Sequence, residues 1–407
     1  MTISAALKVK LMDQKKQHAT DKFTKLTNMV HKKSLVIFAG RLGGRLLDNV
    51  KYLFRHCVLN ELPFSSYFLT HFHDEHQRLV QNGLPSLLFP SDDALRILPQ
   101  AKVVVTDDFW FKTETPAYRL LTEARTVQIW HGIPLKLIGF PEIESNVNMT
   151  PKKAEILKIG YSGYDAAVST SPFVTATSLG KVFKADAIWE TGYPRNDVLV
   201  REPDTLDLMG VDIDSIVRVK VLKKTGHKLV FFMPTFRDTG GDPFTEGVLD
   251  LAAMDAFGRK NKIAFLLKFH PYLSINAELG LRNVYIINSS TDAYPLLSYC
   301  DCLLTDYSSV AYDFLLTGKP LIFFPYDLQK FIAKDRGMFY QFDEMAPGPR
   351  PTNQKELFEI LADVLLEGKD EYVTCRNELA DRLFTHRDGN AAKRITELLV
   401  QTFFSDS

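Results

Sequence analysis

The sequence is poor in cysteine and carries no net charge, and each of these features excludes a class of protein. The 407 residues contain no CxxC pair and only four cysteines: Cys57, Cys300, Cys302 and Cys375. A disulfide-dense secreted scaffold is therefore excluded, and the thiols fit a reducing compartment. Lysine and arginine number 49, and so do aspartate and glutamate. This balance argues against a nucleic-acid partner, because bulk electrostatic binding of nucleic acid needs a basic domain.

Long hydrophobic runs are also missing. No apolar stretch approaches the ~18–20 residues that a membrane-spanning helix needs, and the N-terminus has no apolar signal-peptide segment. We therefore expect a cytoplasmic protein. Residues 1–33 carry eight lysines and two aspartates, a local charge of +6. This basic arm is either a solvated leading helix or a segment that touches an anionic membrane surface or a lipid-linked acceptor.

Short apolar runs alternate with amphipathic stretches of helix length along most of the chain. This alternation is typical of βαβ units and parallel sheets, and predicts an α/β fold. The candidate strands fall into two series. The first series is 35–39, 66–69, 103–106, 127–130 and 166–169, and the second is 229–233, 264–269, 284–287, 303–305 and 321–324.

A polar, charged stretch over residues 201–228 separates the two series, and we place the inter-domain boundary there. The predicted organisation has two doubly wound, Rossmann-like domains that face each other across a cleft, with helices at the C-terminus. Its parts are the basic arm 1–33, a first domain over 34–200, a second over 201–375, and helices over 376–407. In open parallel sheets, ligands bind beyond the carboxyl ends of the strands.

Two histidines follow buried strands, one in each predicted domain. His131 follows the strand 127–130 in QIWHGIPLK, and His270 follows the strand 264–269 in AFLLKFHPYL. An imidazole over the cleft suits a general base that acts on a hydroxyl, although a single histidine at such a place is often structural. The equivalent positions predict that the two rings face each other. Lys136, shortly after His131, could hold an anionic group.

Residues after two further strands of the second series indicate a phosphate site. Arg237 in MPTFRD suits a phosphate fork, and a surface ion pair with Asp238 is the alternative. In TDYSS, Asp306 precedes Ser308 and Ser309 at the predicted start of a helix. These serines could cap the helix, or offer hydroxyl and N–H groups to a phosphate.

Several nucleotide and metal motifs are absent or incomplete. There is no Walker A and no GxGxxG sequence, and the one DxD, at 212–214, lies in the polar boundary stretch. THFHDEH at 70–76 is similar to the HxHxDH motif of metallo-β-lactamase-type hydrolases, but Glu75 stands where aspartate is expected. We expect no metal site. A zinc hydrolase built on this segment is the rival function from another class.

Taken together, QIWHGIPLK, ETGYPRNDVL, MPTFRD, KFHP, TDYSSVAYDF and APGP resemble the CDP-glycerol glycerophosphotransferase family. This family contains teichoic-acid primases and polymerases and their capsule-polymerase relatives. The order and spacing of the motifs agree over roughly residues 34–350. The resemblance implies a GT-B fold whose first domain meets the acceptor and the membrane, and whose second binds the cytidine nucleotide.

The resemblance implies transfer of a polyol phosphate from a CDP-activated donor, most simply CDP-glycerol, with release of CMP. The acceptor would be a hydroxyl of a lipid-linked saccharide or a growing polymer, at the inner face of the cytoplasmic membrane. No metal or other cofactor is implied. The sequence leaves open glycerol or ribitol, and one added unit or many. A GT-B sugar transferase that uses a nucleotide sugar is the alternative.

The resemblance also implies roles for individual residues. His131 would be the base, and His270 would lie near the donor diphosphate. Arg336 lies in a segment that resembles a family motif, although Met338 and Gln341 interrupt the pattern of that motif. The residues implied on the donor side are Thr235, Arg237, Asp306, Ser308, Ser309 and Arg336. The residues implied at the domain junction or acceptor side are Lys136, Arg195, Asn196 and Asp197.

Overall fold

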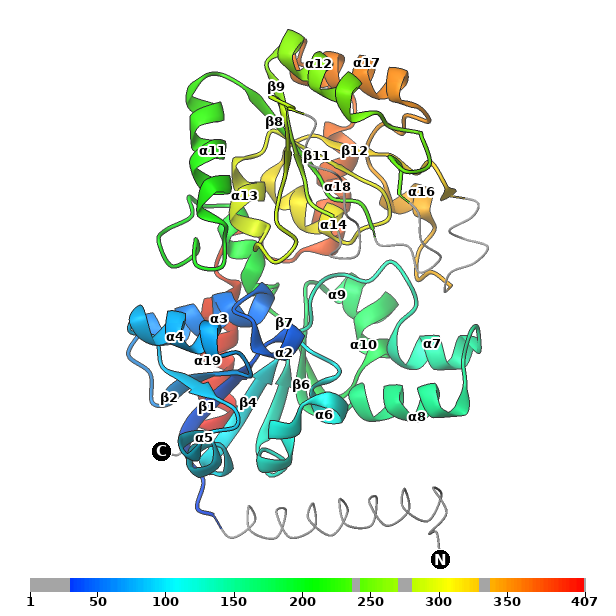
Figure 1. Cartoon of the computed structure of the whole chain (residues 1–407). Coiled ribbons are helices and arrows are strands. Elements are labelled where there is room, and N and C mark those ends of the chain that lie inside the picture. The colour runs from blue at the N-terminus through cyan, green and yellow to red at the C-terminus, as the bar shows by residue number, and fades with distance from the viewer. Residues whose placement is uncertain (1–29, 236–241, 270–279, 329–336, 406–407) are drawn as a thin grey trace, which may run out of the picture.

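The computed structural model describes residues 30–235, 242–269, 280–328 and 337–405. It contains two parallel β-sheets, which lie in separate halves of the molecule stacked along its long axis (Figure 1). The α/β architecture with two doubly wound sheets and C-terminal helices, predicted from the sequence, is confirmed.

The first sheet has seven strands in the order β3-β2-β1-β4-β5-β6-β7. Its strands are β1 (Lys33–Ala39), β2 (Ser65–Thr70), β3 (Ser86–Leu88), β4 (Ala101–Thr106), β5 (Arg125–Gln128), β6 (Ser162–Ser169) and β7 (Lys184–Glu190). The second sheet has five strands in the order β10-β9-β8-β11-β12. They are β8 (Lys228–Phe232), β9 (Ile263–Leu267), β10 (Val284–Ile286), β11 (Cys302–Thr305) and β12 (Leu321–Phe323).

Each strand predicted from the sequence is present, and two further strands, β3 and β7, were missed. Both are edge strands of the first sheet. β3 has only three residues, and β7 has the mixed sequence KADAIWE with several exposed positions. Edge strands need no continuous hydrophobic face, so they leave a weak signal in the sequence.

Helices cover both sheets. Those of the first half are α2 (Arg41–Gly44), α3 (Asp48–Leu59), α4 (His73–Gln81), α5 (Asp92–Ile97), η1 (Leu98–Gln100), α6 (Phe111–Glu114), η2 (Pro116–Leu120), α7 (Gly139–Ser145), α8 (Pro151–Gly160), α9 (Pro172–Val174), η3 (Thr175–Leu179), α10 (Gly180–Val182) and η4 (Pro194–Leu199). Those that follow are α11 (Ile213–Lys224), α12 (Leu251–Asn261), α13 (Tyr294–Tyr299), α14 (Val310–Phe314), η6 (Leu315–Thr317), α16 (Phe342–Met345), α17 (Gln354–Leu365), α18 (Val373–Leu383) and α19 (Ala391–Phe403).

The last helix, α19, returns to the first half of the molecule and lies beside α3 (Figure 1). Two aromatic contacts fasten its end there. The rings of Phe64 and Phe404 are 4.8 Å apart, and those of Trp189 and Phe403 are 6.3 Å apart. The chain therefore crosses between the halves twice, once through η4 and once before α19.

The polar stretch 201–228 contains α11, which begins after Asp212. The carboxylate of Asp212 accepts a hydrogen bond from the backbone N–H of Ser215 at 3.0 Å and one from its hydroxyl at 2.7 Å. The first aspartate of the DxD sequence is therefore a helix cap.

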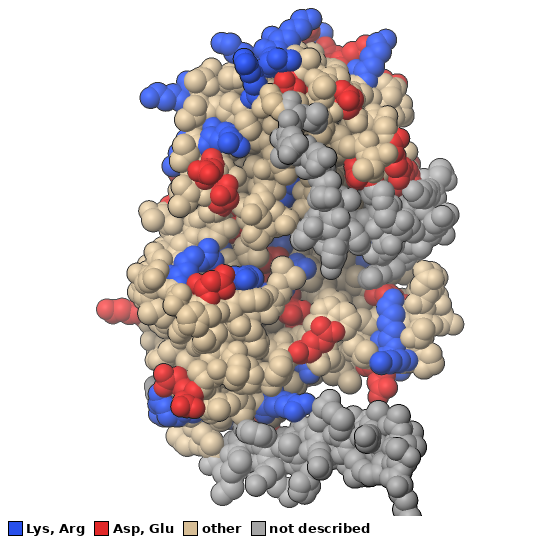
Figure 2. Space-filling view, viewed as in Figure 1, with Lys and Arg blue, Asp and Glu red and all other residues tan. Residues whose placement is uncertain are grey.

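Acidic and basic side chains are interspersed over both halves on the face shown in Figure 2. Among the described residues, no helix combines the length and the apolar character needed to cross a membrane.

Candidate active site

The turn after β5 carries His131 in a strained and well-supported backbone. Trp130 has a φ of 49°, which is rare for a bulky residue, and it is buried. Its N–H donates to the side-chain oxygen of Gln128 at 2.9 Å. Its carbonyl accepts from the amide of Asn49 at 2.8 Å, and its ring lies 3.8 Å from that of His131. Strain held by this many contacts is typical of functional sites.

His131 is held in the tautomer that a general base needs. Its Nδ1 lies 3.0 Å from the backbone carbonyl of Asp107. Since a carbonyl oxygen can only accept, Nδ1 carries the proton and Nε2 keeps its lone pair. Burial and the charge of Arg41 lower the pKa of His131 to about 3, against the opposing effect of Asp48. The ring is therefore neutral at physiological pH.

The turn also reaches the second half of the molecule. A Cβ atom added at Gly132 would lie 2.7 Å from Nη2 of Arg195 and 3.1 Å from Oγ of Ser309. The φ of Gly132 is 133°, a conformation that side chains other than glycine rarely adopt. The structure thus brings His131, Arg195 and Ser309 together, although they lie far apart in the sequence.

Arg195 joins the two halves through ion pairs with two carboxylates. Nη1 lies 2.8 Å from Oδ1 of Asp48 on α3, and Nη2 lies 2.5 Å from Oδ2 of Asp313 on α14. Asn196 and Tyr294 also donate to Asp313, at 3.0 and 2.6 Å. Because two carboxylates neutralise the buried guanidinium, Arg195 is placed to fix the junction rather than to meet a phosphate.

Asp48 completes this cluster on the side of His131. It also pairs with Arg41 at 3.3 Å. Burial acts to raise the pKa of Asp48, but Arg195 and Arg41 hold it below its usual value. Asp48 therefore stays charged beside the neutral imidazole.

Asp197 lies behind this cluster and serves a different purpose. Its two carboxylate oxygens accept the backbone N–H groups of Ala391 and Ala392 at 2.9 and 3.0 Å, so it caps α19. Burial raises the pKa of Asp197 to about 6. The structure thus shows Asp197 at a helix terminus next to the junction residues Arg195 and Asn196, and a contact with the acceptor stays a prediction.

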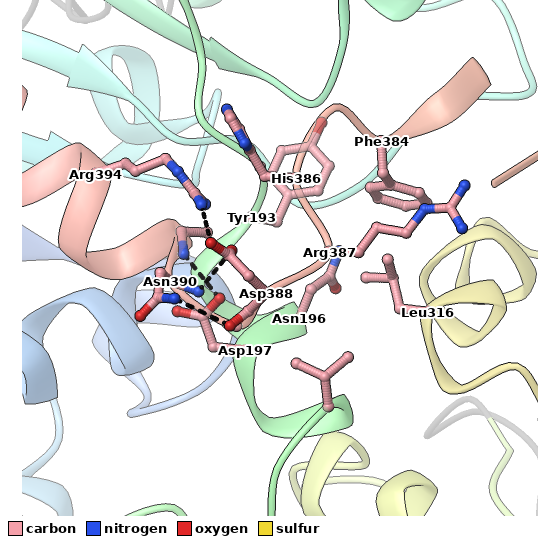
Figure 3. Close-up of a pocket in the computed structure, with 14 residues that line it drawn as sticks. Tyr193, Asn196, Asp197, Leu316, Phe384, His386, Arg387, Asp388, Asn390 and Arg394 are labelled. Carbon is pink, nitrogen blue, oxygen red and sulfur yellow. Dashed lines mark hydrogen bonds and ion pairs between the residues drawn. The ribbon is translucent and has the colours of Figure 1, made fainter. Parts of the chain in front are cut away.

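Figure 3 shows this region, where Asp197, Asp388, Asn390 and Arg394 gather on one side of a small pocket. The pocket has a volume of about 10 Å³, which is room for one water molecule and not for a substrate.

In the second half, the loops after β8 and β11 are tied to each other. The carboxylate of Asp306 accepts the backbone N–H of Thr235 at 2.8 Å and that of Tyr307 at 2.5 Å. Asp306 thus ties the backbone of Thr235 to the loop that continues into Ser308 and Ser309. Among the described residues, the side chain of Ser309 makes no capping hydrogen bond to α14, so the cap alternative does not account for this serine.

A second connection between the halves runs through Lys136. The residues on either side of it pair with the segment 337–339 in an antiparallel bridge. The N–H of Leu137 donates to the carbonyl of Gly337 at 2.7 Å, and that of Phe339 to the carbonyl of Leu135 at 2.8 Å. Lys136 therefore lies at the domain junction.

Three predicted donor-side residues, His270, Arg237 and Arg336, lie outside the described residues, as do residues 1–29 of the basic arm. The predicted meeting of His131 and His270 across the cleft therefore stays a prediction. The same holds for the phosphate contacts of the two arginines.

Asp107, Asp48 and Asp313 belong to the site but were not predicted from the sequence. Asp107 is buried after β4, where its side chain accepts the N–H groups of Arg41 and Val50 at 3.0 and 3.2 Å. Since it directly follows the strand 103–106 in VVVTDD, the rule that selected His131 could have found it.

Two of the three histidines of THFHDEH, His71 and His76, bond to protein groups. Nδ1 of His71 lies 3.2 Å from the carbonyl of Gly43, and Nδ1 of His76 lies 3.1 Å from the hydroxyl of Ser86. In the part of the chain that the structure describes, no group of three or more His, Cys, Asp or Glu side chains is placed to hold a metal ion. The zinc-hydrolase alternative thus gains no support from this segment.

Comparisons with known proteins point to one family. The model of the family described as CDP-glycerol:poly(glycerophosphate) glycerophosphotransferase matches residues 22–401. A teichoic acid glycerol-phosphate transferase of Staphylococcus aureus is 27% identical over 396 residues, covering 94% of this chain and 97% of the relative. A teichoic acid ribitol-phosphate polymerase of the same organism is 25% identical, covering 92% of this chain and 69% of the relative.

The fold is that of a solved structure of the wall teichoic acid polymerase TagF, which has a GT-B-like fold. The two superpose with a TM-score of 0.74 at 22% identity, over 100% of this chain and 99% of the other. The GT-B fold predicted from the sequence is confirmed. The match of the family model over nearly the whole chain is decisive: the chain belongs to the CDP-glycerol:poly(glycerophosphate) glycerophosphotransferase family.

Proposed function

We propose that this chain transfers glycerol phosphate from CDP-glycerol to a hydroxyl of a lipid-linked saccharide or growing polymer and releases CMP, in the synthesis of a teichoic-acid or capsule-type envelope polymer. The observation that carries the proposal is the state of His131. Its Nδ1–H is committed to the carbonyl of Asp107, its Nε2 keeps a lone pair, and its turn contacts Ser309 of the second half.

In this reaction Nε2 of His131 takes the proton of the acceptor hydroxyl. The oxygen attacks the phosphorus that carries the glycerol, a new P–O bond forms, and the bond to the CMP oxygen breaks. The electron pair leaves with CMP. The loops after β8 and β11, which carry Thr235, Ser308 and Ser309, would hold the diphosphate, with His270, Arg237 and Arg336 expected to add positive charge.

CDP-ribitol is a second candidate donor, because the relatives with similar sequences include ribitol-phosphate enzymes as well as glycerol-phosphate ones. The two donors share the cytidine diphosphate and differ in the length of the polyol.

The experiment is a donor comparison with the full chain, in which CMP or UMP release is measured with CDP-glycerol, CDP-ribitol or a UDP-sugar and a saccharide acceptor. We expect CDP-glycerol to give the highest kcat/KM. Release from the UDP-sugar alone would contradict the proposal.

Three further parts of the proposal concern the location of the enzyme, its contact with lipid and its need for a cofactor. We propose that the enzyme works at the inner face of the cytoplasmic membrane as a peripheral protein, that its basic arm contacts anionic lipid, and that no metal or other cofactor takes part. The local charge of +6 over residues 1–33 supports the second.

A further inference from the structure

A short segment that follows β12 in the chain, residues 337–342, connects the two halves of the molecule, and we call it the strap. The carbonyl of Gly337 accepts the N–H of Leu137 at 2.7 Å, and the N–H of Phe339 donates to the carbonyl of Leu135 at 2.8 Å. Leu135 and Leu137 lie at the end of the turn that carries the proposed base. The first part of the strap is therefore hydrogen-bonded to that turn.

Tyr340 fastens the strap to a helical turn of the first half. Its hydroxyl donates to Oγ of Ser178 at 2.8 Å, and the same oxygen lies 2.7 Å from Oγ1 of Thr177. Both residues belong to η3, which is a π-helix, a rare form that occurs frequently at functional sites. The ring of Tyr340 also stacks on that of Phe173, with the centroids 5.9 Å apart. One tyrosine thus makes polar and aromatic contacts with the other half.

The far end of the strap contacts the loop after β11. The ring of Phe342 lies 5.4 Å from that of Tyr307, which directly precedes Ser308 in the loop that we expect to hold the diphosphate. The hydroxyl of Tyr307 lies 3.1 Å from Oδ1 of Asp327, which comes before the strap in the chain. Tyr307 therefore contacts the chain both before the strap and at its end.

The turn of His131 is thus held against the second half at both of its ends. At its beginning, Gly132 lies close to Arg195 and Ser309. At its end, the two backbone hydrogen bonds to the strap hold it. The imidazole cannot move toward or away from the diphosphate loop without disturbing one of these contacts. Because a misplacement of about 1 Å can cost about 10²-fold in rate, such contacts matter for the chemical step.

We infer that the strap fixes the distance between His131 and the diphosphate loop, and that Tyr340 is the positioning residue that fastens it. The inference rests on the proposed function and adds a residue that acts through the turn of His131. Loss of this role lowers the rate of the chemical step in the bound complex. It leaves binding of CDP-glycerol, which we expect in the second half, nearly unchanged.

The test compares Tyr340→Phe with wild type in the full chain, with CMP release from CDP-glycerol and a saccharide acceptor as the readout. This variant keeps the ring against Phe173 and loses only the hydroxyl. We expect kcat to fall about tenfold, while the KM for CDP-glycerol changes less than about twofold. Tyr285→Phe is the matched control, because the Tyr285 hydroxyl donates to the carbonyl of Arg282 within its own half, and its kcat should be normal.

A double-mutant cycle separates positioning from a general loss of stability. Ser178→Ala removes the acceptor of the same hydrogen bond, so it should also lower kcat. The double variant should be no slower than Tyr340→Phe alone, because both changes break one interaction. Unchanged circular dichroism confirms that each variant is folded. Losses of kcat that multiply, or a Tyr340→Phe enzyme with normal kcat, would overturn the inference.

Hydrogen exchange tests the same contact without the reaction. A peptide that contains Leu137 should exchange about tenfold faster in Tyr340→Phe than in wild type, because the N–H of Leu137 bonds to the strap. Mass spectrometry measures the exchange, and the Tyr285→Phe protein should match wild type. Unchanged exchange in Tyr340→Phe would overturn the inference. If wild type releases no CMP from CDP-glycerol, the proposed function has failed, and the exchange rates still decide whether Tyr340 fastens the strap.

Discussion

At the scale of single residues, the site depends on a few side chains that fix the state of one imidazole. Asn49 and Gln128 hold the backbone of Trp130, and Asp107 fixes the proton on Nδ1 of His131. The lowered pKa follows from burial and from Arg41. These contacts prepare a neutral ring whose free nitrogen needs no reorganisation before it accepts a proton.

Replacing His131 by alanine should lower kcat about 10²- to 10⁴-fold, because a positioned general base typically contributes that much. CMP release in the presence of saturating acceptor measures the effect, and binding of CDP-glycerol by calorimetry should be unchanged. His56→Ala, a histidine on α3, is the matched control. An alanine variant at position 131 with near-normal turnover would remove this residue from the mechanism.

Gly132→Ala should also inactivate the enzyme, by at least about tenfold in kcat/KM, because the added Cβ would meet Arg195 and Ser309. Part of the loss of kcat/KM would arise from the positive φ alone. Gly83→Ala measures that part, since Gly83 has a φ of 71° and no heavy atom within 4 Å of the added Cβ. Equal kcat/KM values for the two alanine variants would show that the contact between the halves is not needed.

At the scale of elements, strand ends place the site and helix caps hold it. Asp197 links η4 to the first turn of α19, so the crossing segment and the last helix are fastened to each other. This cap lies one residue from Asn196 and two from Arg195, which hold Asp313. Loss of the cap would therefore also destabilise the contacts at the junction.

The raised pKa of Asp197 predicts a pH dependence of stability. A carboxyl with a folded-state pKa of about 6 and an unfolded value near 3.8 stabilises the fold fully below pH ~4, and this contribution is lost as the pH rises through 6. Relative to Asp197→Asn, the wild-type free energy of unfolding should fall by up to about 3 kcal/mol between pH 4 and 7. Urea unfolding at several pH values measures it.

Asp388→Asn is the matched control, because its pKa is shifted in the opposite direction. Burial acts to raise the pKa of Asp388, but hydrogen bonds from Arg394 and Asn390 lower it. The stability that Asp388 contributes is therefore present above the unfolded pKa and is lost as the pH falls. Slopes of the same sign for both comparisons would contradict the assignment.

The sequence predicts the elements well and the site only in part. Buried strands such as β1 and β9 are continuous apolar runs, and the residues directly after β5 and β11 could be selected by the strand-end rule. The edge strands β3 and β7 lack that signal. Asp48 and Asp313 could not be found, because their roles arise only where α3 and α14 meet Arg195 in space.

At the scale of the whole molecule, buried polar contacts join the two halves. Besides the cluster at Arg195, Lys51 on α3 pairs with Asp292 at 2.6 Å, and Tyr52 donates to the same carboxylate at 2.8 Å. All three side chains are buried or nearly so. A shift of one half against the other would separate these partners and leave a buried charge unpaired, which is costly. These contacts therefore hold the relative position of the halves closely.

The arm should tether the enzyme to anionic membrane in a salt-dependent way. Each basic residue near such a surface contributes about 1 kcal/mol, screened over a Debye length of about 8–10 Å. Deletion of 1–29 leaves Lys32, which donates to the carbonyl of Pro99, and Lys33 in β1. The truncated chain should lose activity on a lipid-linked acceptor more than on a soluble one. A variant with the arm lysines changed to glutamine should behave like the truncated chain. If the truncated chain kept full activity on both acceptors, the arm would be only a solvated leading segment.

Activity should survive chelation with EDTA, because histidine, arginine and hydroxyl groups are expected to absorb the charge that develops as CMP leaves. CMP release before and after EDTA, and after added Mg²⁺ or Mn²⁺, measures this. Loss on chelation with recovery on addition of either ion would contradict the metal-free mechanism.

The central claim is tested most directly by the mass of the acceptor after incubation with CDP-glycerol and the full chain. We expect an acceptor heavier by one or more glycerol phosphate units, formed in step with CMP by wild type and nearly absent with His131→Ala. An unmodified acceptor, or one that gains a sugar from a UDP-sugar instead, would contradict it.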